Sequence, residues 1–338
     1  MKKVIDCFLF FQEVDLLEIR LKYLDPYVDI FIIVEACQTF TGVDKRFVFE
    51  ENKERYADFL DKIVYFKITD FHQDYDSVIS YLNKTNSATS RKVLKIMEEF
   101  NHFPKDKLHW VLDAYHRECI QFPLEEIANN DDIVILSDLD EIPSNKIFGP
   151  DIFHTIEEGP TVCIQREFSY FLNFYRLDSK WLGSIYGYKQ AMLSLGMNGL
   201  RMDVRARQLN VTGTVEDGGY HFTSVGSIDD IRKKIESWGH QEFNNPRVKK
   251  NLEYKIASGQ DPFGRQAGTI FLKVEPNNPE YFDNRMGELI IQYPNLIANK
   301  DIEQISLNLF LYLKNKVELN YNKVINKLSK WHNKKSID

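Results

Sequence analysis

Short apolar runs that alternate with stretches of helical periodicity constrain the fold of this chain more than any other feature. Residues 4–11, 30–34, 63–66 and 132–137 each read as a strand, and the run 30–34 contains only Ile, Phe and Val. A strand without alternating polar residues is typical of a parallel sheet that is covered on both faces. These runs therefore predict strands at the centre of the molecule.

Helical periods separate the predicted strands. Val14, Leu17, Leu21 and Leu24 recur on one helical face, and further helices are expected at 52–60 and 108–122. Strands that alternate with helices predict the α/β class, with a mostly parallel sheet and helices on both faces.

The pattern changes after residue 140. Loops are expected to dominate residues 170–226, and a helix capped by Ser227 and Asp230 should follow. Residues 301–332 return to helical periods and predict a packed pair of C-terminal helices. Seven lysines against four acids in 301–338 leave contact with a membrane surface as the alternative.

Charge and cysteine content limit the partners and the cellular locations that we expect for this protein. Lys and Arg number 43 against 50 Asp and Glu, giving a net charge of −7, which argues against a nucleic-acid partner. The four cysteines are widely scattered, and that pattern indicates free thiols in a reducing compartment. The N-terminal residues lack the features of a signal peptide, and no apolar run is long enough to span a membrane. We expect a cytoplasmic protein.

Three carboxylates follow the strand 132–137 directly, in the sequence Asp138-Leu139-Asp140-Glu141. Ligands in open α/β sheets bind beyond the carboxyl ends of the strands, so this is the expected place of a site. Asp138 and Asp140 point the same way in an extended chain, and their oxygens suit a hard cation such as Mg²⁺ or Mn²⁺. A solvated acidic turn or a helix cap is the alternative for such a sequence.

A second segment with unusual composition is Asp217-Gly218-Gly219-Tyr220-His221-Phe222. Its two glycines permit unusual backbone angles or the close approach of a ligand. His221 is either a ligand or a structural histidine among aromatic neighbours.

Four blocks of sequence resemble one known family, the β-1,4-mannosyl-glycoprotein 4-β-N-acetylglucosaminyltransferases (glycosyltransferase family 17). The blocks lie within residues 6–21, 34–42, 132–143 and 219–222, and their order and spacing agree over roughly residues 4–260. Leu139 and Tyr220 replace the Ala and Trp expected in the family. The membrane anchor and stem of its Golgi members have no counterpart in this sequence.

The resemblance implies a GT-A-type, Rossmann-like fold and an inverting, metal-dependent transfer from a UDP-sugar, UDP-GlcNAc in the animal enzymes. The acceptor would be a glycan or a lipid-linked sugar. Residues 1–143 would form the nucleotide-sugar-binding half of the domain and 144–265 its acceptor and catalytic half. Residues 266–338 would form a C-terminal helical extension.

The resemblance also suggests roles for particular residues. Asp140 would bind the cation (Mn²⁺ or Mg²⁺), Asp138 would contact the cation or the ribose, and His221 would complete the metal site. Arg117 is either a phosphate ligand or a surface charge. Glu35 either accepts from the uracil ring or caps local structure.

Inversion requires a general base for the acceptor hydroxyl. Glu216 and Asp217 are the first candidates because they stand close to His221 in the sequence. Glu167 and Glu242 are further candidates.

Two other functions are compatible with parts of the sequence. Nucleotidyl transfer uses a similar sheet, but it normally places a glycine-rich loop after the first strand, where this chain has Phe10-Phe11-Gln12-Glu13. A non-catalytic sugar-binding module would use the abundant aromatic residues without any transfer. Slow hydrolysis of a nucleotide sugar would distinguish an enzyme from such a module.

Overall fold

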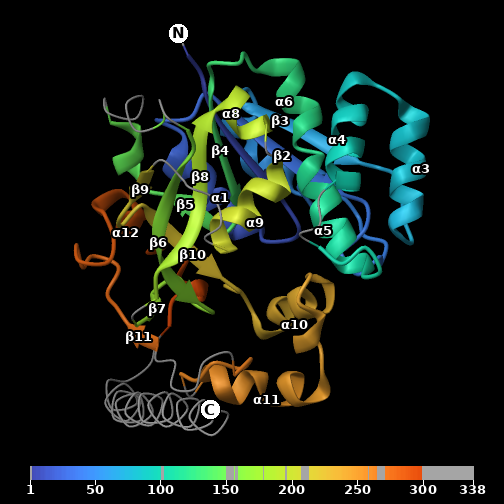
Figure 1. Cartoon of the computed structure of the whole chain (residues 1–338). Helices are drawn as coiled ribbons and strands as arrows, with labels where there is room; N and C mark the ends of the chain where they lie inside the picture. The colour runs from blue at the N-terminus through green and yellow to red at the C-terminus, as the bar shows by residue number, and fades with distance from the viewer. Residues whose placement is uncertain are drawn as a thin grey trace, which may run out of the picture.

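The computed structural model describes the chain over residues 2–99, 103–149, 156, 159–177, 179–194, 196–206, 213–257, 259–264 and 271–298 (Figure 1). The strands are β1 (Val4–Leu9), β2 (Ile30–Ala36), β3 (Ile63–Ile68), β4 (Ile133–Asp138), β5 (Glu141–Pro143), β6 (Thr161–Ser169), β7 (Phe174–Arg176), β8 (Trp181–Tyr188), β9 (Gly213–Val215), β10 (Gly219–Thr223) and β11 (Phe271–Lys273). The α-helices are α1 (Val14–Leu24), α2 (Val48–Glu51), α3 (Tyr75–Thr85), α4 (Ala88–Glu99), α5 (Leu108–Glu118), α6 (Gln121–Ile127), α8 (Lys189–Ser194), α9 (Met197–Ala206), α10 (Ile228–Ser237), α11 (Pro246–Ala257) and α12 (Asn284–Ile290). Short 3₁₀ helices are η1 (Lys53–Phe59), η2 (Asn145–Phe148), η3 (Gln241–Phe243) and η4 (Pro294–Leu296).

One mixed sheet organises these elements, with the strand order β11-β7-β6-β8-β4-β1-β2-β3. Strands β4, β1, β2 and β3 are parallel, whereas β8 runs antiparallel to both β4 and β6. Leu9 at the end of β1 pairs with Val34 and with Asp138, so the carboxyl ends of three parallel strands meet at one level. The predicted α/β class is confirmed.

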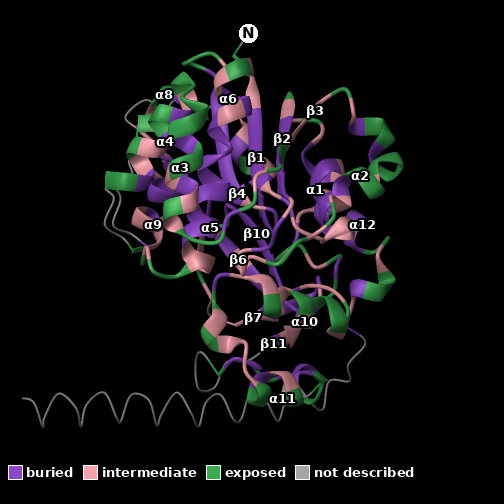
Figure 2. Cartoon of the chain, turned by 90° about the vertical axis from the view of Figure 1, so that its right-hand side faces the viewer, coloured by how far each residue is buried: buried purple, intermediate pink, exposed green. Residues whose placement is uncertain are grey.

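Side chains of β1 and of the residue just after it show why helices cover both faces of the sheet. Ile5 and Cys7 pack into a core with α3–α6, α8 and α9, whereas Phe8 and the following Phe10 pack into a core with α1 and α12. Because side chains alternate along a strand, a run that is apolar at every position needs a partner layer on each side. Figure 2 shows the strands as the buried centre between helices with exposed outer faces.

Residues 170–226 were expected to be mostly loops, but the structure places β8, α9 and β10 there. The glycines of β8 account for the difference. A Cβ built on Gly183 would lie 1.9 Å from the side-chain oxygen Oε1 of Gln165, so the Gln165 side chain of β6 occupies the space that this glycine leaves. Glycine within a strand marks such close approaches, although in a sequence it resembles a turn.

The helix predicted after Ser227 is confirmed as α10. Ser227 Oγ accepts from Asp230 N, while the Asp230 carboxylate accepts from Ser227 N, and this reciprocal cap fixes the start of the helix. Helices α10 and α11 share an apolar core with β7 and β11. In Figure 1 the two helices lie below most of the sheet.

Residues 271–298 are the described part of the segment that was expected as a C-terminal extension. They pack as part of the main domain. Strand β11 pairs with β7, and α12 packs beside α1, where Arg285 Nε donates to Tyr23 O at 3.0 Å. The helices predicted at 301–332 lie outside the described residues. Among the described helices, none has the length and apolar character needed to cross a membrane.

Candidate functional site

The acidic loop after β4 is shaped from beneath by a fully buried arginine. Arg20 on α1 binds the carboxylate of Asp6 through Nε (2.8 Å) and Nη2 (2.6 Å). Its Nη1 group donates to three carbonyl oxygens of the loop, those of Asp138 (3.1 Å), Leu139 (3.0 Å) and Glu141 (2.9 Å). One guanidinium therefore donates to three carbonyl groups and ties the loop to α1 and to Asp6.

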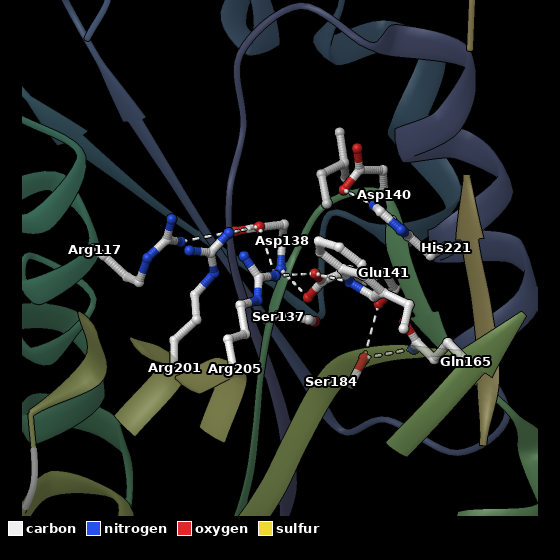
Figure 3. Close-up of polar contacts among 12 residues, drawn as sticks. Arg117, Ser137, Asp138, Asp140, Glu141, Gln165, Ser184, Arg201, Arg205 and His221 are labelled. Carbon is white, nitrogen blue, oxygen red and sulfur yellow. Dashed lines mark hydrogen bonds and ion pairs between the residues drawn. The ribbon is translucent and has the colours of Figure 1, made fainter. Parts of the chain in front are cut away.

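Asp138 is surrounded by three arginines from two helices (Figure 3). Its Oδ1 accepts from Arg117 Nη1 of α5 at 2.8 Å, and its Oδ2 accepts from Arg201 and Arg205 of α9. Burial alone would raise the pKa of Asp138, but Arg201, Arg117 and Arg205 outweigh it and hold this pKa well below its ordinary value. Asp138 is thus an ionised anchor for the arginines.

Asp140 faces a lysine and a histidine instead. Lys234 Nζ of α10 lies 2.9 Å from Asp140 Oδ2, and His221 Nε2 lies 3.8 Å from Oδ1. Burial raises the pKa of Asp140, whereas Lys234 and His221 lower it, with a net shift below the ordinary value. His221 stacks on Trp181 with ring centroids 4.4 Å apart, and its Nδ1 is buried with no hydrogen-bond partner among the described residues.

These groups line a cavity of about 580 Å³ at the carboxyl edge of the parallel strands. That volume is within the range of small-molecule and cofactor sites. Its wall is mostly apolar and includes Trp110, Trp181 and Trp238. The charged residues of the lining are Glu13, Lys45, Asp113, Arg117, Asp138, Asp140, Glu167, Arg201, Arg205 and Lys234.

Five of the predicted site residues meet in this cavity: Arg117, Asp138, Asp140, Glu167 and His221. Arg117 is a buried partner of Asp138 and of Asp113, so the alternative of a surface charge does not hold.

Glu35 lies behind the cavity and is not part of its lining. Its carboxylate accepts from Lys45 Nζ (2.6 Å), Tyr65 Oη (2.9 Å) and the backbone N–H groups of Val48 (2.7 Å) and Phe49 (3.1 Å). These contacts cap the first turn of α2, which is the structural alternative for this residue.

The carboxylates considered as base occupy different places. Glu216 and Asp217 lie in the exposed turn before β10, where they pair with Lys180 (3.0 Å) and Arg166 (2.8 Å), outside the cavity lining. Glu242 is exposed beside His240, also outside the lining. Glu167 lines the cavity next to His221, its partner in the β6–β10 register.

The sequence reasoning missed the arginines of α9 and the lysine of α10. Arg201 and Arg205 stand four residues apart on the helix whose buried face carries Met197, Leu200 and Val204. That spacing is a helical signal, which Gly196 and Gly199 obscured. Lys234 stands on a helix that was predicted correctly, but the sequence does not show where its side chain points, because that depends on how the helix packs.

The expected divalent cation requires side-chain ligands that converge on one point. Among the described residues, no three His, Cys, Asp or Glu side chains converge to hold a metal ion. Both oxygens of Asp138 are occupied by guanidinium groups, so it does not fit as a direct ligand. Asp140 and His221 are the two side chains that would hold a cation, because no hydrogen bond joins them and His221 Nε2 lies 3.8 Å from Asp140 Oδ1.

An α/β sheet with a charged cavity at the carboxyl edge of its parallel strands is typical of enzymes that bind nucleotides. Residues 1–96 match the model of glycosyltransferase family 17. This match is to the same family that the sequence resembles, and it supports a glycosyltransferase. The matched segment contains Asp6 and Arg20 and ends before the acidic loop. A search of curated proteins finds no match to the chain.

Proposed function

We propose that the protein transfers a sugar, most directly GlcNAc from UDP-GlcNAc, onto a hydroxyl of a glycan or a lipid-linked sugar, with inversion at the anomeric carbon. The observation that carries the proposal is the cavity in which Asp138, Asp140 and three arginines lie together at the strand ends. The family match supports sugar transfer, and the choice of donor rests on the family resemblance.

The arginine cluster is suited to the diphosphate of the donor. Guanidinium groups bind phosphate oxygens through paired N–H groups. Arg117, Arg201 and Arg205 are fixed by Asp138, and their Nε groups have no hydrogen-bond partner within the described part of the chain. The cluster therefore retains donors after it has paired with the carboxylate.

The balance of charge favours a divalent cation, Mn²⁺ or Mg²⁺. The described cavity lining holds five carboxylates, those of Glu13, Asp113, Asp138, Asp140 and Glu167, and five cationic side chains, those of Lys45, Arg117, Arg201, Arg205 and Lys234. A diphosphate would add negative charge to a lining that has no excess of positive charge. Asp140 and His221 would hold the cation, which when bound supplies Lewis-acid stabilisation of the diphosphate.

Glu167 is our choice as the general base. Burial raises its pKa, but His221, Arg176 and Ser179 lower it to a net value below the ordinary one, so the carboxylate is ionised at neutral pH. Its two oxygens accept from Arg176 and Ser179 and retain lone pairs for an acceptor hydroxyl. In this role it receives the proton as the hydroxyl oxygen attacks the sugar.

Glu167→Gln is expected to lower the transfer rate by about 10²–10⁴-fold while UDP binding persists, because only the proton acceptor is lost. Glu216→Gln and Asp217→Asn are the matched comparison, since both change a carboxylate of the same region outside the cavity. Initial transfer rates of the three variants decide between them. A loss confined to Glu216→Gln or Asp217→Asn would move the base to the turn before β10.

UDP with Mn²⁺ is expected to raise the melting temperature, whereas GDP with Mn²⁺ should have a smaller effect. A ligand at 100 times its dissociation constant stabilises the folded state by about 2.7 kcal/mol. A panel of nucleotide sugars, scored by release of the nucleoside diphosphate, then identifies the donor. Preference for GDP- or CMP-sugars would overturn the choice of UDP-GlcNAc.

The same panel addresses the two other functions. A sugar-binding module would bind without releasing the nucleoside diphosphate, and a nucleotidyltransferase would release pyrophosphate from a nucleoside triphosphate. The expected cytoplasmic location is supported by the cysteines, since Cys7, Cys37, Cys119 and Cys163 are all free thiols. Recovery of the native protein only from a secreted or lumenal fraction would contradict it.

A further inference from the structure

Lys234 is a half-buried cation that reaches the site from outside the main sheet. It stands on α10, and its ammonium group contacts Asp140 Oδ2 at 2.9 Å and Glu13 Oε1 at 3.3 Å. Glu13 directly precedes α1, so this one side chain joins three separate parts of the fold beside the cavity.

The ammonium group has one donor to spare. Lysine carries three N–H donors, and Asp140 and Glu13 account for two of them. No partner for the third is found in the described portion of the chain. Because Lys234 is part of the cavity lining, this donor is available to a bound ligand.

The arginine cluster is already balanced by carboxylates within the protein. Its three members, Arg117, Arg201 and Arg205, form ion pairs with three carboxylates, those of Asp113, Asp138 and Glu141. Lys234 is the cation that faces Asp140, the carboxylate that we assign to the metal. A phosphate bound at Asp140 through a cation would therefore lie beside the ammonium group.

We propose that Lys234 is a catalytic residue that donates a hydrogen bond to the β-phosphate of the donor and stabilises it as the leaving group. This inference rests on the proposed function and assigns a further residue to that site. It gives α10 a role in the reaction, although α10 lies outside the segment that matches the family.

The transfer step then balances as follows. The acceptor oxygen forms a bond to the anomeric carbon, and the bond from that carbon to the β-phosphate oxygen breaks with its electron pair remaining on the phosphate. The acceptor proton passes to Glu167. Lys234 keeps its own proton and acts only through charge and its hydrogen bond.

Two carboxylates hold the ammonium group of Lys234 in place, Asp140 at 2.9 Å and Glu13 at 3.3 Å. A cation held in this way suits the stabilisation of a leaving group through its charge rather than proton transfer.

The test compares Lys234→Met with Lys233→Met, a neighbouring exposed lysine on the same helix. Binding of UDP and of UMP, each with Mn²⁺, is measured by calorimetry, together with kcat for transfer. For Lys234→Met we expect UDP to bind about tenfold or more weakly. Its kcat should fall by about 10²-fold. UMP, which lacks the β-phosphate, should bind as to the wild type.

Lys234→Arg keeps the charge and should recover part of kcat and of UDP affinity, which also guards against a folding defect in the Met variant. Equal UDP affinity and kcat in Lys234→Met and Lys233→Met would overturn the proposal. Equal losses of UDP and UMP affinity would overturn it as well, since they would show that Lys234 only supports the pocket. If the wild type itself binds no UDP, the proposed donor fails, which is a separate result.

Discussion

Arg20→Met is expected to lower the free energy of unfolding by about 3–5 kcal/mol, the largest stability effect that we predict for a single side chain. The substitution leaves the fully buried Asp6 carboxylate without its partner. It also removes the guanidinium donor from three carbonyl oxygens of the 138–141 loop, of which only that of Glu141 has a further side-chain donor in the described structure, Ser184 Oγ. Urea unfolding measures the loss, and transfer activity should fall with it because the loop carries Asp138 and Asp140.

Arg55→Met is the matched control for this prediction. Arg55 also pairs with two acids of α1, Asp15 and Glu18, but all three side chains are partly exposed. Solvent screens such pairs, so its loss should cost no more than about 1 kcal/mol. A cost for Arg20→Met as small as that for Arg55→Met would contradict the role of Arg20 as the support of the loop.

The double variant Asp6→Leu/Arg20→Met separates the two contributions of the arginine. Removing both charges abolishes the unpaired carboxylate and should recover part of the loss. In the double variant the carbonyl oxygens of Asp138 and Leu139 still lack the donor that Arg20 supplied, so recovery should be incomplete.

The central strands and the acidic loop could be predicted because their signals are local. An apolar run such as 30–34 has few alternatives to a buried strand, and a motif that follows a central strand has a fixed position relative to the sheet. Asp138 and Asp140 were expected at the site on that ground, and the structure places both in one cavity.

The remainder of the site depends on tertiary packing that no local pattern records. Gly196 and Gly199 obscured the helical spacing of Arg201 and Arg205, so the helix that carries these arginines was missed. Glu216 is close to His221 in sequence, yet it lies in the exposed turn before β10, where it pairs with Lys180. Glu167 is far from His221 in sequence but is its neighbour in the register of the sheet.

The buried role of Arg20 was equally hidden. Its position on α1 shows only that a charge lies on a helix, and such a charge is usually solvated. Asp6 interrupts an apolar strand, and in a buried strand this requires a partner. The two observations together would have predicted the pair.

Asp140→Asn is expected to lower transfer by about 10²-fold or more while the protein stays folded. The substitution is almost isosteric, so the loop held by Arg20 changes little. It removes the negative charge that faces both Lys234 and His221, and an amide is a poorer ligand than a carboxylate for a hard cation. Initial rates and melting temperatures, each with and without Mn²⁺, measure the two effects separately.

Glu141→Gln provides the contrast because its carboxylate is engaged within the protein. It accepts from Asp138 N (3.0 Å), Trp181 Nε1 (2.7 Å) and Arg205, and it is buried. Its loss should therefore lower the melting temperature and the rate together, with or without metal. Asp140→Asn should instead reduce the rate and the stabilisation by Mn²⁺ with UDP, at a nearly unchanged melting temperature in chelator. Wild-type activity in Asp140→Asn with unchanged metal dependence would exclude Asp140 as the carboxylate that holds the cation, and the charge of the leaving group would then have to be met by Lys234 and the arginines alone.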